Sequence, residues 1–511
     1  MHPQSRKTRL PIVLAALWLA ACGGGGGNDT PATPAPAPVA SGPTAPAPAP
    51  APVPAPAPAP APAATTTVSA DTQLAINTSY AVSAPSANTV TLTLPATAAA
   101  TAGSTVSVQG VSATPWVIAQ NAGQSVLTSA LPGNVTVGST FTPRMAPKVW
   151  HWVTSDATGE VLLAGEAANG LLNTSTDGGA TWTNGNSVPG VWISSDMSAT
   201  GDRMVAVQYQ GTGMYISTDK GVTWNQVTSS PLVFNSDTTV TGLSFESVTM
   251  SADGLHIAAV IQQGRLVISN DGGVTWSAPT LPVAAGTTQN LPWRSVDNSA
   301  DGTVIVAASQ DGQLFRSLDS GATFTLIVDP AAATNPVAVD NWYRVRLSGD
   351  GKTIAIVGNT FGGQPGRGIY VSHDQGATFT TGFALTIDYT ALAVSADGKT
   401  IAATASTTGT TTGRVLLSTD GGATFNPITP SSTEGQWRAV ALSADGNKMA
   451  VAAGNFAVPT TGQLYTSQGN RTSIGTAGSI TGGQNGTVTL QSLGAGQWVV
   501  QSAAGGPFTI R

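Results

Sequence analysis

A repeated unit constrains the fold of this 511-residue chain more than any other feature. Each copy begins with an aromatic residue at the start of a short apolar stretch and runs into a turn, as in "WRSVDNSADG" at Trp293 and "WRAVALSADG" at Trp437. The turn glycines lie 42 to 53 residues apart, at Gly159, Gly201, Gly254, Gly302, Gly351, Gly398 and Gly446. A period of about 40–50 residues with four short strands per unit indicates a β-propeller blade. We predict an all-β fold with a seven-bladed propeller over residues 145–473, because ring closure removes free sheet edges.

An octapeptide recurs in phase with this unit. It reads "STDGGATW" at 175–182 and "STDGGATF" at 418–425, with four near-copies between them. The pattern resembles the Asp-box, or BNR repeat, of sialidase-like propellers, which implies a hairpin between the third and fourth strands of a blade. There an Asp side chain bonds backbone N–H groups, a glycine supplies the turn conformation, and the closing aromatic ring packs on the blade. We expect structural rather than ligand-binding roles for Asp177, Asp219, Asp271, Asp319, Asp374 and Asp420.

The seventh unit departs from this pattern. At the corresponding place it reads "SQGNRT" from Ser467, without the Asp or the closing aromatic residue. We expect a strand that precedes Val149, within residues 135–144, to complete the last blade and close the ring. Decay of a terminal repeat is the alternative.

The N-terminal residues have the pattern of an export signal. Basic residues precede an apolar run, Leu10–Ala21, that is too short for a permanent membrane span. The ending "LAAC" resembles the bacterial lipobox, which implies cleavage before Cys22 and lipidation of its thiol; an ordinary signal peptide with an incidental Cys is the alternative. By the family's sorting rule, Gly23 favours the outer membrane. We therefore assign residues 1–22 to a lipoprotein signal, and 23–64, Gly-rich and then Pro/Ala-rich, to an extended tether.

The segments on either side of the propeller read as short strands. The N-terminal module, 65–140, contains "NTVTLTLP" and a strand around Trp116, and the C-terminal segment, 474–511, repeats the pattern in "GTVTLQ" and around Trp498. They weakly resemble β modules of phage tail fibres. The C-terminal segment is too short to fold alone, so we predict one small β-domain built from both segments. Two separate modules are the alternative.

Composition limits the partners. Charged residues make up only 9% of the chain and the net charge is −6, without basic clusters, so we expect no nucleic-acid partner. Four His are scattered without metal-ligand spacing, and we expect neither a metal nor another cofactor. The single Cys excludes an internal disulfide. We expect a monomer.

The chain lacks a recognisable catalytic motif. Glycosidases need positioned carboxylates, but only four Glu are present, and half of the 22 Asp residues belong to the two repeated turns. The Phe-Arg-Ile-Pro signature of sialidases is absent. Non-catalytic relatives of the Asp-box repeat include sortilin-type receptors and photosystem II assembly factors, which implies a docking platform. We expect an outer-membrane lipoprotein of the cell envelope, facing the periplasm or the cell surface, that binds a protein or a polysaccharide. The alternatives are a sialidase-like glycoside hydrolase acting on envelope or extracellular glycans, and an assembly chaperone.

Five residues near the starts of the first strands are candidates for ligand binding, because the resemblance places that part of each blade beside the central channel. Four are arginines in a chain with few charges, and together they would form a positive mouth for an acidic peptide or an anionic glycan: Arg294, Tyr343, Arg344, Arg346 and Arg438. The alternative is that these arginines pair with nearby Asp297, Asp340 and Asp388.

Overall fold

The computed structural model describes residues 65–511 except 84–88, 129, 132–135, 167–169, 210–212, 229–243, 284–288, 328–341, 359–367, 384–387, 407–412, 433–434, 455–461 and 473–474. The predicted signal peptide, Cys22 and the tether lie outside the described residues. Nearly all regular structure is β, as predicted, and the helical exception in the described part is a 3₁₀ turn, η2 (Gly475–Ala477). No helix in this part of the chain is long and apolar enough to cross a membrane.

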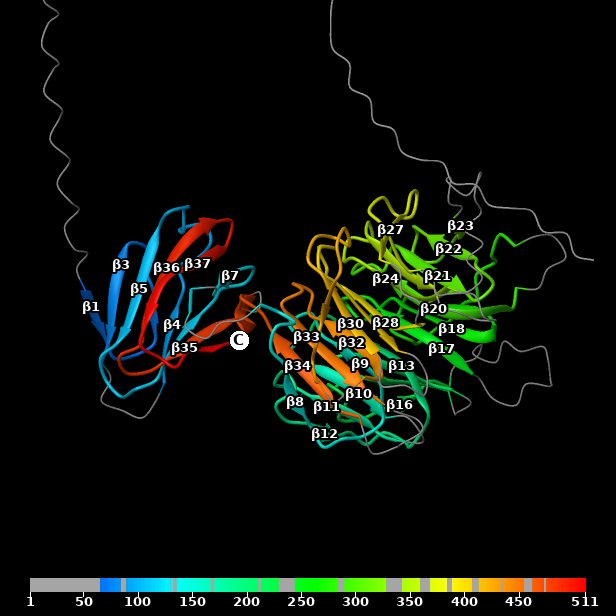
Figure 1. Ribbon diagram of the computed structural model, residues 1–511, viewed down its shortest axis with the longest axis horizontal. Coiled ribbons are helices and arrows are strands. Elements are labelled where there is room, and N and C mark those ends of the chain that lie inside the picture. The colour runs from blue at the N-terminus through cyan, green and yellow to red at the C-terminus, as the bar shows by residue number, and fades with distance from the viewer. Residues whose placement is uncertain are drawn as a thin grey trace, which may run out of the picture. The chain divides into compact units, whose positions relative to one another are not determined.

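Two sheets draw their strands from both ends of the described chain (Figure 1). The first sheet has the order β1 (Thr65–Val68), β3 (Thr78–Val82), β5 (Thr105–Gly110), β36 (Thr487–Gly494), β37 (Gln497–Ala504) and β7 (Ser125–Leu127). The second has the order β2 (Thr72–Gln73), β4 (Val90–Thr93), β6 (Trp116–Ala119), β35 (Ser479–Gly482) and β38 (Thr509–Ile510). Strand β36 pairs with β5, and β35 pairs with β6, so the flanking segments are joined by backbone hydrogen bonds across more than 350 residues of sequence.

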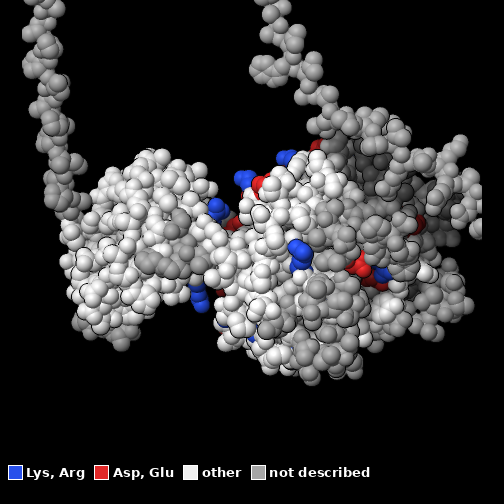
Figure 2. Space-filling view, viewed as in Figure 1, with Lys and Arg blue, Asp and Glu red and all other residues white. Residues whose placement is uncertain are grey.

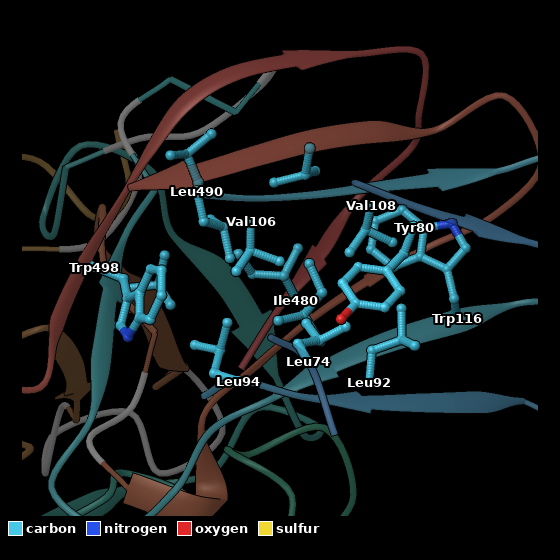
Figure 3. Close-up of a cluster of buried hydrophobic side chains, with 14 of the residues drawn as sticks. Leu74, Tyr80, Leu92, Leu94, Val106, Val108, Trp116, Ile480, Leu490 and Trp498 are labelled. Atoms are coloured by element: carbon cyan, nitrogen blue, oxygen red, sulfur yellow. The ribbon is translucent and has the colours of Figure 1, made fainter. Parts of the chain in front are cut away.

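One apolar core serves both of these sheets (Figure 3). Side chains alternate between buried and partly exposed along β4 and β36, as expected of strands with one face on a core. Trp116 from the N-terminal segment and Trp498 from the C-terminal segment are both fully buried in this core. Neither segment therefore has a complete core of its own.

The residues between these segments form a series of antiparallel sheets in which each sheet uses consecutive strands. The first two sheets contain β9 (Trp150–Ser155), β10 (Leu162–Glu166), β11 (Leu172–Ser175) and β12 (Thr183–Asn184), then β13 (Trp192–Met197), β14 (Met204–Gln208), β15 (Met214–Ser217) and β16 (Asn225–Gln226). A joined pair follows, with β17 (Phe245–Met250), β18 (Ile257–Gly264) and β19 (Leu266–Ser269), then β20 (Leu291–Asn298), β21 (Ile305–Ser309), β22 (Leu314–Ser317) and β23 (Thr325–Leu326). The end of β18 pairs with the start of β20, which joins the two groups into one sheet.

Three more sheets complete the series. They contain β24 (Trp342–Leu347), β25 (Ile354–Gly358), β26 (Gly368–Ser372) and β27 (Thr380–Phe383), then β28 (Asp388–Val394), β29 (Ile401–Ser406), β30 (Gly413–Ser418) and β31 (Asn426–Ile428), and last β32 (Trp437–Leu442), β33 (Lys448–Ala453), β34 (Leu464–Gln468) and β8 (Thr142–Arg144). Strand β8 pairs with β34, Tyr465 lying opposite Pro143. The prediction that a strand from before Val149 completes the last sheet is confirmed. This pairing joins a strand from the start of the series to a strand from its end.

The first strands pack against one another in order, from β9 to β13 and on to β32, which packs against β9. Backbone hydrogen bonds between the turns that follow these strands close the same circuit. Each turn N–H donates to the next turn's carbonyl, in the order Ala157, Ala199, Ala252, Ala300, Gly349, Ala396 and Ala444, and Ala444 donates back to Ala157, over 2.7–3.1 Å. Each of these residues stands two positions before a turn glycine and is Ala or Gly, and the small size of these residues permits the close approach.

Candidate functional site: the channel between the first strands

The repeated octapeptide forms the same hairpin in each copy. In the first copy, Thr181 donates from its backbone N–H to Asp177 Oδ1 over 2.8 Å and from its hydroxyl to Oδ2 over 2.6 Å, while Ser175 Oγ donates to Oδ1 over 2.8 Å. The same set of bonds recurs at Asp219, Asp271, Asp319, Asp374 and Asp420. Hydrogen bonds from the Thr378 hydroxyl and N–H lower the pKa of Asp374 to about 2. Both carboxylate oxygens are thus engaged within the turn.

A hairpin glycine fixes each octapeptide against the preceding sheet. Gly321 has a φ of +85°, and a Cβ built there would lie 2.1 Å from Ile268 Cδ1 on β19. Only glycine combines this backbone conformation with such close packing. The octapeptide therefore serves both the turn and the contact between neighbouring sheets.

The first strands surround a channel with a cavity of about 270 Å³. Three positions along each strand, counted from its leading aromatic residue, supply most of its polar lining. Counted with the leading aromatic residue as zero, the first position holds His151, Ile193, Glu246, Arg294, Tyr343, Thr390 and Arg438; the second holds Trp152, Ser194, Ser247, Ser295, Arg344, Ala391 and Ala439; the fourth holds Thr154, Asp196, Thr249, Asp297, Arg346, Ala393 and Ala441. Of these residues, all line the cavity except Glu246, Thr249, Arg294, Ser295 and Tyr343. Because this surface is assembled from seven strands, its chemistry changes around the ring.

On one side of the channel, short polar side chains bond the next first strand. Ser194 accepts from the N–H of Val248 over 3.3 Å, and Ser295 accepts from the N–H of Val345 over 3.2 Å. Ser247 makes the equivalent bond to Val296. Two residues further along each strand, Asp196 Oδ2 accepts from Met250 N–H over 2.8 Å and Asp297 Oδ2 accepts from Leu347 N–H over 2.7 Å. These side chains cap backbone donors that a first strand, lying at the edge of its sheet, leaves unpaired.

The two aspartates also share a hydroxyl. Thr249 Oγ1 lies 3.1 Å from Asp196 Oδ2, 3.1 Å from Asp297 Oδ1 and 2.9 Å from Asn298 Oδ1. One hydroxyl proton cannot serve three acceptors, so the cluster favours a proton on a carboxyl. Burial, reinforced by the neighbouring Asp196 charge and opposed by Arg346, raises the pKa of Asp297 to about 6. Burial likewise raises the pKa of Asp196.

The other side of the channel carries arginines and alanines. Arg344 Nη1 donates to the carbonyls of Arg294 and Tyr343, and its guanidinium lies 4.4 Å from the centroid of the Tyr343 ring. Arg438 Nε donates to Gly454 O over 3.2 Å. Arg344, Arg346 and Arg438 all line the cavity. Burial lowers the pKa of His151 to about 4, with Arg344 and Arg438 adding to the effect, so its imidazole is neutral.

The five predicted ligand-binding residues thus lie on the first strands, but they differ in their surroundings. Arg294 bonds Glu246, at 3.4 Å, and Gln310, at 2.7 Å, and lies outside the residues that line the cavity. Arg346 has Asp196 and Asp297 as charged neighbours, in line with the alternative prediction of pairing. Asp340 lies outside the described residues. The first-strand arginines are therefore partly balanced by acids, and Arg344 and Arg438 contribute most of the excess positive charge.

Sequence analysis named Asp297 only as a possible partner of the arginines, and it did not identify Asp196 or the serine caps as channel residues. A signal for them was present, because they stand at fixed positions after each leading aromatic residue. Among the described residues no group of three or more His, Cys, Asp or Glu could hold a metal ion. Charged side chains are also sparse on the face shown in Figure 2.

No family model and no curated protein matches this chain. Solved structures to which this chain is similar include YCF48 bound to D1 peptide (15% identity, TM-score 0.43, 64% of this chain and 95% of the other). The Cps50 (Swd1) β-propeller domain of Myceliophteria thermophila is 13% identical, with a TM-score of 0.47 over 64% of this chain and 99% of the other. The GH74 enzyme of Niastella koreensis is 15% identical, with a TM-score of 0.45 over 71% and 55%.

The pairing of consecutive strands into sheets, and the circuit of contacts between their first strands, are those of a β-propeller. The chain folds as a β-propeller whose channel has a serine- and aspartate-capped side and an arginine- and alanine-lined side.

Proposed function

We propose that this chain is a lipid-anchored envelope protein whose seven-bladed Asp-box propeller is a non-catalytic docking platform for an acidic partner, either a protein segment or an anionic polysaccharide. One observation carries the proposal: Arg344, Arg346 and Arg438 converge on one channel, and Tyr343 stacks on Arg344. Arginine in a cavity partly screened from water binds carboxylates strongly, because its planar donors engage both oxygens.

The hydrogen bonds of the acids support binding rather than catalysis. The octapeptide aspartates are engaged inside their turns, and Asp196 and Asp297 accept backbone N–H groups from neighbouring strands. A general acid or nucleophile must instead present a free oxygen to the substrate. We therefore assign these carboxylates to the scaffold.

Binding is tested by affinity capture from detergent-solubilised envelope, run beside a glycan array. The full chain is compared with an Arg344→Ala/Arg346→Ala/Arg438→Ala variant, and Arg414→Gln serves as control because that exposed arginine lies on β30, away from the lining of the channel. We expect the triple variant to lose the captured partner and the control to keep it. Unchanged capture by the triple variant would reject the arginine mouth, and glycan capture without protein would reject a protein partner.

The anchor is a separate part of the proposal and rests on the lipobox-like "LAAC" sequence. We propose that lipidated Cys22 holds the chain in the outer membrane through the Pro/Ala-rich tether. Cys22→Ser should abolish labelling by a radioactive fatty acid and move the protein out of the membrane fraction. Retention of label by this variant would contradict the assignment.

A sialidase-like glycoside hydrolase is the second candidate, favoured by one observation. Asp196 and Asp297 approach the same Thr249 hydroxyl and the pKa of Asp297 is raised to about 6, both features of paired catalytic carboxyls. Glycan turnover by the full chain that disappears in Asp196→Asn and Asp297→Asn would favour this candidate over docking.

A further inference from the structure

Backbone N–H groups face the channel from the first strands, because the part of each strand that lines the channel has a sheet neighbour on one side only. Strand β20 also pairs with the end of β18, but at Leu291 and Pro292, before its leading aromatic residue. In β17 and β24 these donors are capped by side chains from the preceding first strand. The third residue after the leading aromatic is capped by a serine, as in Val248 and Val345, and the fifth by an aspartate, as in Met250 and Leu347.

Strands β28 and β32 lack such caps. The matching donors of β28 are Leu392 and Val394, but Arg344 and Arg346 occupy the preceding cap positions, and a guanidinium has no acceptor. The matching donors of β32 are Val440 and Leu442, and there the cap positions hold Ala391 and Ala393, whose methyl groups cannot accept either. Among the described residues, the side chains at these cap positions therefore supply no acceptor, and Val394 and Leu442 are partly exposed, so a ligand in the channel can reach their N–H groups.

The capped side shows which group fits. At the fifth position the acceptor in β17 and β24 is a carboxylate, bound over 2.8 Å and 2.7 Å. Around the uncapped donors, Arg344, Arg346 and Arg438 supply positive charge, and the small side chains of Ala393 and Ala441 leave room at the cavity wall. On one side of the ring, the N–H of the fifth residue therefore binds a carboxylate of the chain. On the other side, the equivalent N–H lies beside arginines and small alanines that leave room for a ligand.

We propose that a ligand carboxylate occupies the arginine- and alanine-lined side, accepts hydrogen bonds from the N–H groups of Val394 and Leu442, and is held by the guanidinium of Arg346. This deepens the proposed docking function and rests on it. The cavity of about 270 Å³ admits a short chain and not a folded element. The carboxylate belongs either to a small free dicarboxylate or to the C-terminus of an extended peptide inserted from a docked protein.

The test is calorimetric titration of the full chain in detergent. Succinate is compared with succinamide, which matches its shape but carries no charge, and a short peptide with a free C-terminal carboxylate is compared with its C-terminal amide. We expect the carboxylate member of at least one pair to bind about tenfold or more tightly than its amide. Preference for succinate identifies the free acid, and preference for the free-terminus peptide identifies the inserted chain end. Equal behaviour within both pairs would overturn the proposal.

The matched variant is Ala393→Asp, which places the chain's own carboxylate at the cap position before Leu442, as Asp297 does before Leu347. We expect it to weaken carboxylate binding at least as strongly as Arg346→Gln, while Arg414→Gln leaves binding unchanged. Ala393→Ser supplies a neutral acceptor at the same place and should weaken binding even if the aspartate variant does not fold. Undiminished binding by folded Ala393→Ser and Arg346→Gln would place the ligand elsewhere and reject the site.

The two proposals fail in different ways. If envelope capture depends on the arginines but each carboxylate ligand binds no more tightly than its amide, the docking function is supported and the carboxylate site is rejected. If the carboxylates bind as expected but no partner is captured, the site stands and the macromolecular partner is rejected.

Discussion

Replacement of Asp297 by Asn should stabilise the protein at neutral and basic pH. The pKa of Asp297 is raised from 3.8 to about 6, because burial and the neighbouring Asp196 oppose its charge more than Arg346 supports it. In the unfolded chain an aspartate titrates near its ordinary value, about 3.9. The folded state therefore binds the proton more tightly than the unfolded state between about pH 4 and pH 6.

The direction of this effect follows from the linkage between proton binding and folding. A carboxyl with a raised folded pKa contributes most to stability below the unfolded pKa, and its ionisation removes stability as pH rises through the folded pKa. A shift of this size corresponds to about 3 kcal/mol in the free energy of unfolding above pH 6. Asn at 297 keeps a carbonyl acceptor for Leu347 N–H and an NH₂ group for the Thr249 cluster, but it never ionises. It also loses the attraction to Arg346, so we expect a net gain of about 1–3 kcal/mol at pH 8 and little change at pH 4.

The measurement is urea unfolding of the full chain at pH 4, 6 and 8, followed by tryptophan fluorescence. Asp202→Asn is the control, because Asp202 is exposed and pairs with exposed Lys220 at 3.3 Å; its effect should stay within about 0.5 kcal/mol. The charged and polar groups around Asp297 come from three strands and are the same in both proteins: Asp196 on β13, Thr249 on β17 and Arg346 on β24. If the free energies of unfolding of Asp297→Asn and the wild type change in parallel from pH 4 to pH 8, the raised pKa of Asp297 in the folded protein is refuted.

Two further predictions test the scaffold. Asp177→Ala removes the acceptor of three hairpin hydrogen bonds, so we expect a loss of about 1–2 kcal/mol by urea unfolding without a change in partner capture; loss of capture with unchanged stability would instead favour a ligand role. Gly321→Ala should lower stability by about 2–4 kcal/mol, because it combines positive-φ strain with overlap on Ile268. Gly103→Ala is its control, with a φ of +89° and no heavy atom within 4 Å of the added Cβ, and it should lower stability by only about 1 kcal/mol; equal losses would show that packing on Ile268 is unimportant.

The repeated elements were predictable because their interactions are local. The hairpin of 175–182 is held by bonds between residues two to four positions apart, so its sequence contains the whole structure of the turn. The leading aromatic residues also mark the first strands, because they pack into the core at the start of each unit; Trp192 and Trp293, for example, are fully buried. The last sheet was harder, because β8 and β34 are more than 300 residues apart, and only the defect at Ser467 indicated that another strand was needed.

The sequence by itself determined a repeating all-β chain, the positions of its turns and the structural place of its octapeptide aspartates, because turn chemistry and strand periodicity operate over a few residues. Tertiary structure decided the channel. Asp196, Thr249 and Asp297 meet only because three first strands, about 50 residues apart in sequence, are brought side by side. The pairing of β5 with β36 is likewise set by the shared core of Trp116 and Trp498. Contacts of this kind depend on which strands close the ring, and no stretch of sequence short enough to be read by itself contains them.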